Sequence, residues 1–189
     1  MSNSISNKMS ESSTAQPDSS VKTDGVKPIA AQTSGFTFNH TMLRVKDPVK
    51  SLAFYTGVLG MTLLTVKKFP NMAFDLYFLA KLTDSERENL PASEDLAIYT
   101  FRQRGILELT HNYGTETQDD FSYHNGNEAP QGFGHICFSV PDLAASVAWF
   151  DSHDVTFKKR PEEGSMKSIA FIEDVDGYWI EIVQAGLMA

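Results

Sequence analysis

The sequence predicts an α+β fold built from two related βαβββ modules whose mixed sheets form a cup. The first observation is an internal repeat: NHTMLRV at residues 39–45 and GFGHICFSV at residues 132–140 each place a histidine in a short apolar strand. The second observation concerns the segments that follow these strands: SLAFY (residues 51–55) and SVAWF (residues 146–150) align without a gap. A repeat of this kind decides the fold before any single element is assigned. We therefore expect one structural unit written twice.

The first module is expected to span residues 36–112. Its helix should begin at Asp47, whose side chain can cap the first turn, with Pro48 in the first helical position. Gly60 is suited to end the helix in a left-handed conformation. The polar stretch 81–94 predicts an excursion between strands. We expect strands at residues 38–45, 61–68, 74–80, 96–102 and 106–111, the last two as a hairpin through residues 103–105, and assign the module to the βαβββ class.

The second module is expected at residues 132–184, followed by a short tail at residues 185–189. Asp142 should cap a helix in the same way as Asp47 does. A polar connector at residues 113–131 separates the modules, and its Asn125-Gly126 pair is a strong turn signal. The remaining elements are strands at 132–140, 155–159, 168–173 and 178–183, a helix at 143–153, a charged loop at 160–167 and a tight DVDG turn at 174–177.

Residues 1–35 predict a disordered N-terminal tail. The segment is rich in Ser, Thr, Asn and Gln, and it has too few large apolar residues to offset the entropy lost on ordering. It contains no apolar core of a secretory signal, and its acidic residues and lack of Arg argue against a transit peptide.

The overall charge excludes some partners. The chain of 189 residues has a formal net charge of −8, so its field does not attract nucleic acid or an anionic membrane. No apolar run has the length of a membrane span. The single cysteine, Cys137, allows no intrachain disulfide and is typical of a reducing, cytoplasmic setting. We expect Cys137 to be a buried small hydrophobe.

Four residues at equivalent places of the two modules form a candidate metal site. Glu108 and Glu181 each lie in the middle of an apolar strand, where a charged carboxylate is costly unless it is paired or bound to a metal. Together with His40 and His135 they supply two imidazoles and two carboxylates. These ligands suit Zn, Ni or Fe, and a glutamate beside a divalent metal can also act as a base. The alternative is that the histidines are hydrogen-bonded core residues and the glutamates are partly exposed.

The longer motifs resemble a known family. They are HTMLRVKDPVKSLAFYTGVLGMTL, LELTHNYGTE, YHNGN, GFGHI and DVDGYWIEI, and they extend from about residue 38 to residue 183. This set is similar to the glyoxalase I (lactoylglutathione lyase) family of the vicinal oxygen chelate superfamily.

The resemblance implies a reaction and the residues that carry it. The substrate would be the hemithioacetal of glutathione and methylglyoxal, which is isomerised to S-lactoylglutathione through a metal-bound enediolate, in methylglyoxal detoxification. His40, Glu108, His135 and Glu181 would be the metal ligands. Glu181 would be the principal base, and Glu108 would act on the opposite face of the substrate. The family also implies a homodimer whose sites are shared between subunits.

The resemblance further implies glutathione contacts. Arg44 and Asn112 match residues that hold the γ-glutamyl end, Lys159 matches one near the glycyl carboxylate, and Met166 lies in the loop that closes. Gln131 stands where animal enzymes have an Arg, and Ser165 stands where they have a Lys. Losing a bidentate Arg removes a strong carboxylate contact, so we expect weaker glutathione binding or compensation by nearby cations. The implied binding residues are Arg44, Asn112, Gln131, His135, Lys159, Ser165 and Met166, and the possible compensating residues are Lys158, Arg160 and Lys167.

The metal and two other functions stay open at this point. Animal members of the family have Gln at the position of His40, whereas bacterial members commonly have His. The excursion at residues 81–94 and the N-terminal arm resemble the longer zinc-type chains, so we favour Zn²⁺, one per site, with Ni²⁺ as the alternative. An extradiol iron dioxygenase would use His40, His135 and Glu181 and leave Glu108 without a role. A non-catalytic ligand-binding member, such as an antibiotic-sequestering protein, tends to lack the metal ligands.

Overall fold

The structure is a computed structural model that describes residues 23–188. The chain divides into two units, Met1–Phe36 and Thr37–Ala189. Within the first unit, the described residues are exposed and include one 3-10 turn, Ala31–Thr33. The part of the expected tail at residues 1–22 lies outside the described residues. No helix in the described range is long and apolar enough to cross a membrane.

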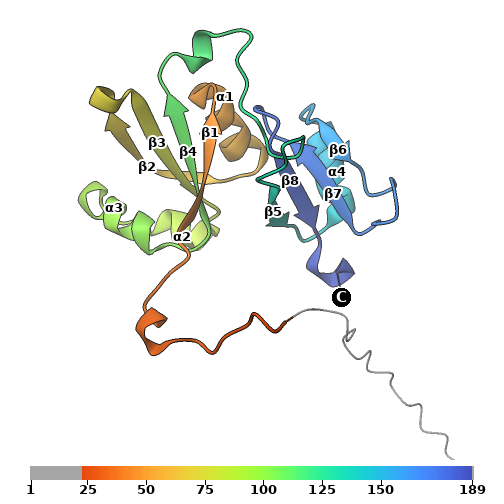
Figure 1. The fold of residues 1–189 in the computed structure, drawn as a ribbon, viewed down its shortest axis with the longest axis horizontal. Coiled ribbons are helices and arrows are strands. Elements are labelled where there is room, and N and C mark those ends of the chain that lie inside the picture. Colours follow the sequence, from red (N-terminus) through yellow and green to blue (C-terminus); the bar gives the residue numbers. More distant parts are fainter. Residues whose placement is uncertain (1–22, 189) are drawn as a thin grey trace, which may run out of the picture. The chain divides into compact units, whose positions relative to one another are not determined.

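The first βαβββ module forms one four-stranded sheet in the order β1-β4-β3-β2 (Figure 1). The first strand, β1, runs parallel to the last, β4, and the other neighbouring pairs are antiparallel. The elements are β1 (His40–Val45), α1 (Pro48–Leu52) continued by a π-helical stretch (Ala53–Val58), β2 (Thr62–Phe69), β3 (Phe74–Ala80), α2 (Asp84–Glu88), α3 (Ser93–Arg102) and β4 (Ile106–Asn112).

The second module repeats this topology in a second sheet, of order β5-β8-β7-β6. Again the first strand and the last are parallel neighbours. The elements are β5 (His135–Ser139), α4 (Leu143–Asp151), β6 (Phe157–Lys159), β7 (Ile169–Glu173) and β8 (Trp179–Val183). The predicted α+β fold of two related modules with mixed sheets is therefore confirmed.

The expected helix ends are present. Asp47 accepts a hydrogen bond from the backbone N–H of Val49 at 2.9 Å, and Asp142 accepts one from Ala145 at 2.8 Å. Each satisfies one of the free N–H groups in a first helical turn. Gly60 has φ +65°, the left-handed conformation that a residue with a Cβ disfavours.

The predicted strand at residues 96–102 is wrong, because this segment belongs to helix α3. Its short run of apolar and aromatic residues resembles a buried strand, but Thr100 donates its hydroxyl back to the carbonyl of Leu96 at 2.7 Å, one helical turn away. The helix packs on the first sheet, where the Phe101 ring meets Phe78 edge-on at 5.1 Å. Without the extra strand, the first module has the four strands that a βαβββ unit requires.

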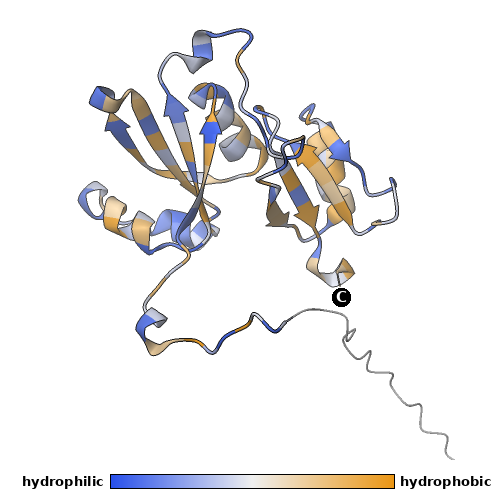
Figure 2. Ribbon diagram, viewed as in Figure 1, coloured by the Kyte–Doolittle hydropathy of each residue, from blue (hydrophilic) through white to orange (hydrophobic). Residues whose placement is uncertain are grey.

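Each sheet has a core face and an opposite face, which we call the open face; in the first module, α3 and a second hydrophobic cluster cover part of this opposite face. The strands alternate hydrophobic and hydrophilic residues, as Figure 2 shows, so successive side chains point to opposite faces. On β8, Ile180 and Ile182 are fully buried, whereas Glu181 between them is only partly buried. One hydrophobic cluster joins the core faces of both modules, and each fully buried Leu or Ile in it contributes about 2 kcal/mol of transfer free energy. Its largest fully buried members are Tyr55, Leu79, Leu109, Ile172, Ile180 and Ile182.

Candidate metal centre and active site

Strand parity brings the four predicted ligands together as two pairs on the open faces. On β1 and β4, the Nε2 atom of His40 lies 3.1 Å from Oε2 of Glu108. On β5 and β8, the Nε2 atom of His135 lies 3.3 Å from Oε2 of Glu181. The register is the same in both modules, since each Glu is paired with the residue two positions after its His. We call these pairs the first half-site (His40, Glu108) and the second half-site (His135, Glu181).

An aromatic ring accompanies each pair, which the sequence analysis did not single out. Phe78 lies opposite Glu108 in the sheet, and Phe171 lies opposite Glu181. Phe78 meets the His40 ring edge-on at 5.6 Å, and Phe171 meets the His135 ring edge-on at 5.2 Å. The signal was present in the repeat, because both phenylalanines occupy the same place in their strands. Each ring restricts the orientation of its imidazole.

Asn39 fixes the tautomer of His40. Its side-chain amide donates to the carbonyls of Thr100 (3.1 Å) and Gln103 (2.9 Å) at the end of α3. The amide oxygen therefore faces Nδ1 of His40, 2.8 Å away, and this nitrogen must carry the proton. In the neutral ring, the lone pair of Nε2 then points towards Glu108.

Within residues 23–188, the four predicted ligands lie in two separate pairs and not in one group. No group of three or more His, Cys, Asp or Glu side chains among residues 23–188 is placed to hold a metal ion. The physical reason is that the pairs belong to separate sheets, one per module. A single chain thus carries two half-sites.

The residues of each half-site fit a divalent cation. Nε2 of His40 and Oε2 of Glu108, an imidazole nitrogen and a carboxylate oxygen that both suit divalent cations, face each other at 3.1 Å in the first half-site. The hydrogen bond from Nδ1 of His40 to an amide oxygen is the type of contact that orients metal-bound histidines. His40, Glu108, His135 and Glu181 are therefore suited to hold such an ion, and the chemistry of the donors alone allows Zn²⁺ or Ni²⁺.

Cys137 is exposed, so the expectation that it is buried is wrong. It lies two residues after His135, and the alternation of β5 turns it to the open face. Although the residue is exposed, the atoms around its thiol remove part of the thiol's hydration, and this effect, followed by the nearby Glu181 carboxylate, raises the pKa of Cys137 to about 11. The side chain is therefore a neutral thiol at physiological pH, and not a nucleophilic thiolate.

Two of the predicted glutathione-binding residues are in direct contact. Nη1 of Arg44 donates to the amide oxygen of Asn112 at 3.0 Å, and the Tyr123 hydroxyl approaches the same oxygen at 3.4 Å. Arg44 lies on the same face of β1 as His40, at the opposite end of the strand. Among the described residues, its guanidinium forms no ion pair with a carboxylate. Tyr123 belongs to the SYHNGN motif and was not predicted to take part.

The other predicted binding residues lie in loops. Gln131 is exposed in the connector, and Ser165 and Met166 are exposed between β6 and β7. The ammonium group of Lys159 donates to three backbone carbonyls, those of Arg160 (3.1 Å), Met166 (2.6 Å) and Ile169 (3.0 Å). In this structure Lys159 therefore anchors the loop. The possible compensating cations also have partners: Lys158 pairs with Glu173, Arg160 with Asp151, and Lys167 with the carbonyl of Glu162.

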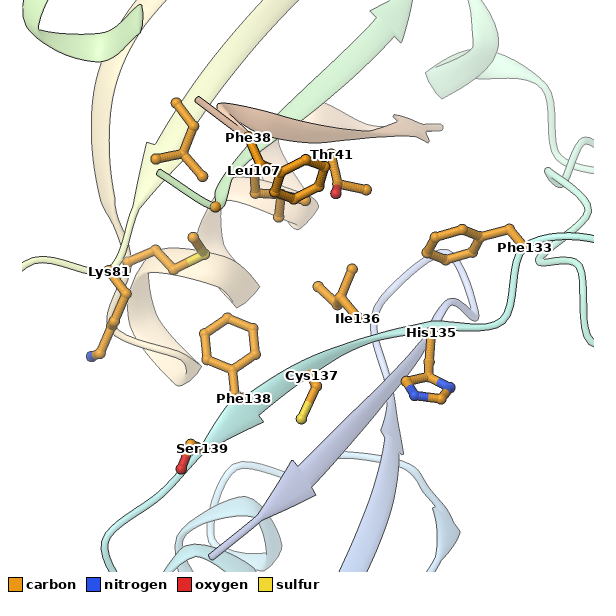
Figure 3. Close-up of a pocket in the computed structure, with 13 residues that line it drawn as sticks. Phe38, Thr41, Lys81, Leu107, Phe133, His135, Ile136, Cys137, Phe138 and Ser139 are labelled. Atoms are coloured by element: carbon orange, nitrogen blue, oxygen red, sulfur yellow. The ribbon is translucent and has the colours of Figure 1, made fainter. Parts of the chain in front are cut away.

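A cavity of about 460 Å³ lies beside β5 (Figure 3). Ile136 and Phe138 point towards Phe38 and Leu107 across it, whereas the side chains of His135 and Cys137 leave β5 on the other side. Of the four ligands, the cavity is lined only by His135. It extends along the core side of β5, and His135 of the second half-site borders it.

Two βαβββ modules with a His–Glu pair in equivalent register define a two-module α+β class of protein. Residues 37–182 match the Glyoxalase/Bleomycin resistance protein/Dioxygenase superfamily, and the chain belongs to that superfamily. A lactoylglutathione lyase from Pseudomonas aeruginosa is 50% identical, and the match covers 95% of this chain and 96% of that protein. A glyoxalase I from Saccharomyces cerevisiae is 49% identical over 77% of this chain and 44% of its own length. Among solved structures, the trypanothione-dependent glyoxalase I of Leishmania major has a TM-score of 0.60 and 32% identity, covering 81% of this chain and 89% of that one.

Proposed function

We propose that the protein is a metal-dependent lactoylglutathione lyase. It converts the hemithioacetal of glutathione and methylglyoxal into S-lactoylglutathione and thereby detoxifies methylglyoxal. The observation that carries the proposal is the pair of equivalent His–Glu half-sites, at 3.1 and 3.3 Å, in a chain that is 50% identical to a lactoylglutathione lyase over almost its whole length.

The half-sites supply the residues that move the proton. Glu181 removes it from the substrate carbon beside the carbonyl and returns it to the neighbouring carbon, so that the reaction is an internal redox isomerisation with no external oxidant. Glu108 faces the substrate from the other half-site. A bound divalent cation would supply Lewis acidity, polarising the two vicinal oxygens of the substrate and stabilising the negative charge that develops on them. Arg44 and Asn112 would bind the γ-glutamyl end of glutathione, since the Arg44 guanidinium has no carboxylate partner among the described residues.

The complete site requires two subunits. A cation needs more than the two protein ligands that one half-site offers, and no third ligand joins either pair within the described chain. We propose a homodimer in which the first half-site of each subunit meets the second half-site of its partner, with one Zn²⁺ per site and Ni²⁺ as the alternative. The lack of an intrachain disulfide supports a cytoplasmic location.

An extradiol dioxygenase is a weaker candidate. It would require two His and one carboxylate, whereas each His here has its own Glu in an equivalent register.

The direct test is an add-back assay. Metal-stripped protein is mixed with glutathione and methylglyoxal, and thioester formation is followed by ultraviolet absorbance before and after addition of Zn²⁺ or Ni²⁺. We expect no turnover without metal and restored turnover with Zn²⁺. A protein that stays inactive with every divalent ion, or that is fully active after metal removal, contradicts the proposal.

A further inference from the structure

Another cavity, of about 340 Å³, lies at the end of α3, where the chain turns into β4. Its charged lining residues come from three segments: Lys81 directly after β3, Glu86 in α2, and Arg102 and Arg104 at the end of α3. None of the four predicted metal ligands lines it. Its volume is within the range of small-molecule sites, about 300–1,000 Å³.

Among the described residues, the three cations of this cavity form no ion pair. This is unexpected in a chain whose acidic residues outnumber its basic ones by 24 to 16. The carboxylate of Glu86 is committed to its own helix, because Oε2 accepts hydrogen bonds from the backbone N–H and the hydroxyl of Thr83, both at 2.8 Å. Three positive charges and one negative charge therefore leave the lining with two net positive charges.

The position of Arg104 argues that these cations face a ligand. Arg102 lies in the last turn of α3, where a cation also complements the partial negative charge of a helix C-terminus. Arg104 lies beyond the helix and has no such role. The Lys81 ammonium donates to the carbonyl of Gly60 at 3.0 Å, which leaves it two N–H groups for another acceptor. Since guanidinium groups bind phosphate and carboxylate oxygens in pairs, the lining is suited to a small dianion.

The same end of α3 supports the first half-site. The Asn39 amide donates to the carbonyls of Thr100 (3.1 Å) and Gln103 (2.9 Å). Arg102 lies between these two residues in the chain, and the amide oxygen of Asn39 faces Nδ1 of His40. A ligand that holds Arg102 restrains the two carbonyls, so that less conformational freedom is lost when the imidazole binds a metal.

We propose that this cavity is a binding site for a phosphate dianion, free or as a monoester, and that its occupation strengthens metal binding at the first half-site. A phosphate group has three or more acceptor oxygens and about two negative charges at neutral pH, which match the net charge of the lining. The anion connects the end of α3 with Lys81. The anion site is independent of the proposed lyase activity, whereas its effect on the metal rests on the proposed metal centre.

Binding is measured by titration calorimetry of the full-length, Zn²⁺-loaded protein with inorganic phosphate and with glycerol phosphate. We expect one site per chain, with an affinity that falls as KCl is added. Arg102→Gln combined with Arg104→Gln should lower the affinity about a hundredfold, a factor of about ten for each charge-assisted contact that is removed. Arg87→Gln is the matched control, because Arg87 already pairs with Asp84 in α2, and it should bind phosphate as the wild type does.

The outcomes are distinct for the cavity and for the metal centre. No wild-type binding at millimolar phosphate, or equal affinities in the wild type and the double variant, would overturn the proposed anion site. Arg44→Gln is titrated in parallel, and a loss of binding in that variant alone would place the anion at the metal centre instead. If thermal unfolding shows that the double variant does not fold, Arg104→Gln takes its place, with an expected loss of about tenfold.

The effect on the metal is measured with sulfate, a dianion of similar shape, because phosphate itself sequesters Zn²⁺. The Zn²⁺ affinity of the metal-free protein is determined by competition with a chelator, in saturating sulfate and in KCl of equal ionic strength. We expect binding to be about fivefold tighter in sulfate, and the double variant to lose this difference. Equal Zn²⁺ affinities of the wild type in the two salts would overturn the link to the first half-site. A wild-type protein that binds no Zn²⁺ at all would contradict the proposed metal centre, and not the anion site.

Discussion

The Tyr55 hydroxyl in the first module donates a 2.6 Å hydrogen bond to Asp174 in the second. Tyr55 is fully buried, and Asp174 is 7% exposed. Two backbone N–H groups, those of Asp176 and Tyr178, donate to the other oxygen of Asp174 at 2.9 Å. Next to this contact, Asp176 accepts a hydrogen bond from the backbone of Lys46 at 3.0 Å. The turn between β7 and β8 thus links the second module to the start of the first helix.

Removing the Tyr55 hydroxyl should destabilise the protein. Tyr55→Phe leaves a buried carboxyl group short of a donor, and we expect a loss of about 1–3 kcal/mol in the free energy of unfolding, measured by urea denaturation. Tyr113→Phe is the matched control, because Tyr113 also donates to an aspartate, Asp75, at 2.6 Å but is 43% exposed, so water can replace it. Equal losses in the two variants would argue against the importance of the contact between modules.

Asp174 should make stability depend on pH in a direction unusual for an aspartate. Burial raises the pKa of Asp174 to about 6, although its hydrogen bonds oppose the shift. The native state therefore binds the proton more tightly than the unfolded state, in which the pKa of this aspartate has its ordinary value of 3.8. The resulting stability is present below pH 4 and is lost as the pH rises to 6, by about 3 kcal/mol for a shift of this size.

The measurement is urea unfolding between pH 4 and pH 7. Asp174→Asn has no titrating proton at this position. The difference in the free energy of unfolding between the wild type and the variant should therefore change with pH over this interval and be constant above it. Parallel profiles for the two proteins would show that Asp174 does not titrate in this range.

Much of this architecture was readable in the sequence. The duplicated histidine strands predicted the two modules, and the repeat placed Glu108 and Glu181 at equivalent positions in their strands. The aspartate caps and Gly60 were recognised because their conformational requirements are local.

What failed depended on contacts between elements. Residues 96–102 form a short apolar and aromatic run that favours a strand in isolation, but the packing of Phe101 on Phe78 and the hydrogen bond from Asn39 to the helix end select a helix. The family resemblance placed Lys159 near a substrate carboxylate, which stays a prediction, whereas the three carbonyls that Lys159 binds were not visible in the sequence. Only the resemblance implied that the sites are shared between subunits, and the placement of the two pairs on separate sheets is seen only in the structure.

Gly126 should be essential for the close packing of its backbone against the segment that leads to His135. It has φ +88°, and a Cβ there would lie 2.1 Å from the carbonyl oxygen of Phe133, two residues before His135. We expect Gly126→Ala to cost about 3 kcal/mol or more, because backbone strain and a clash with backbone add. Gly114→Ala is the control: its φ is +93° but nothing lies within 4 Å, so only the strain of about 1–2 kcal/mol applies. Thermal and urea unfolding of both variants test this, and a clearly lower stability of Gly126→Ala would reveal the clash.

Glu181→Gln should remove the catalytic base while retaining the fold. The amide keeps the shape of the side chain but cannot accept the proton, and we expect kcat to fall about 10²–10⁴-fold. Glu173→Gln is the matched control on the neighbouring strand, where the carboxylate pairs with Lys158 at 3.7 Å and not with a histidine. Steady-state kinetics on the metal-loaded proteins decide the matter, and an unimpaired Glu181→Gln enzyme would contradict the assigned base.

The central claim, that each metal centre is assembled from half-sites of two subunits, is tested most directly by complementation. One chain carries His40→Ala with Glu108→Ala, and the other carries His135→Ala with Glu181→Ala. Either chain alone should be dimeric and inactive. In a random mixture, about half of the dimers are mixed and one of their two sites is intact, so lyase activity should return to about a quarter of the wild-type value. Mixed dimers that form but stay inactive would contradict the shared site.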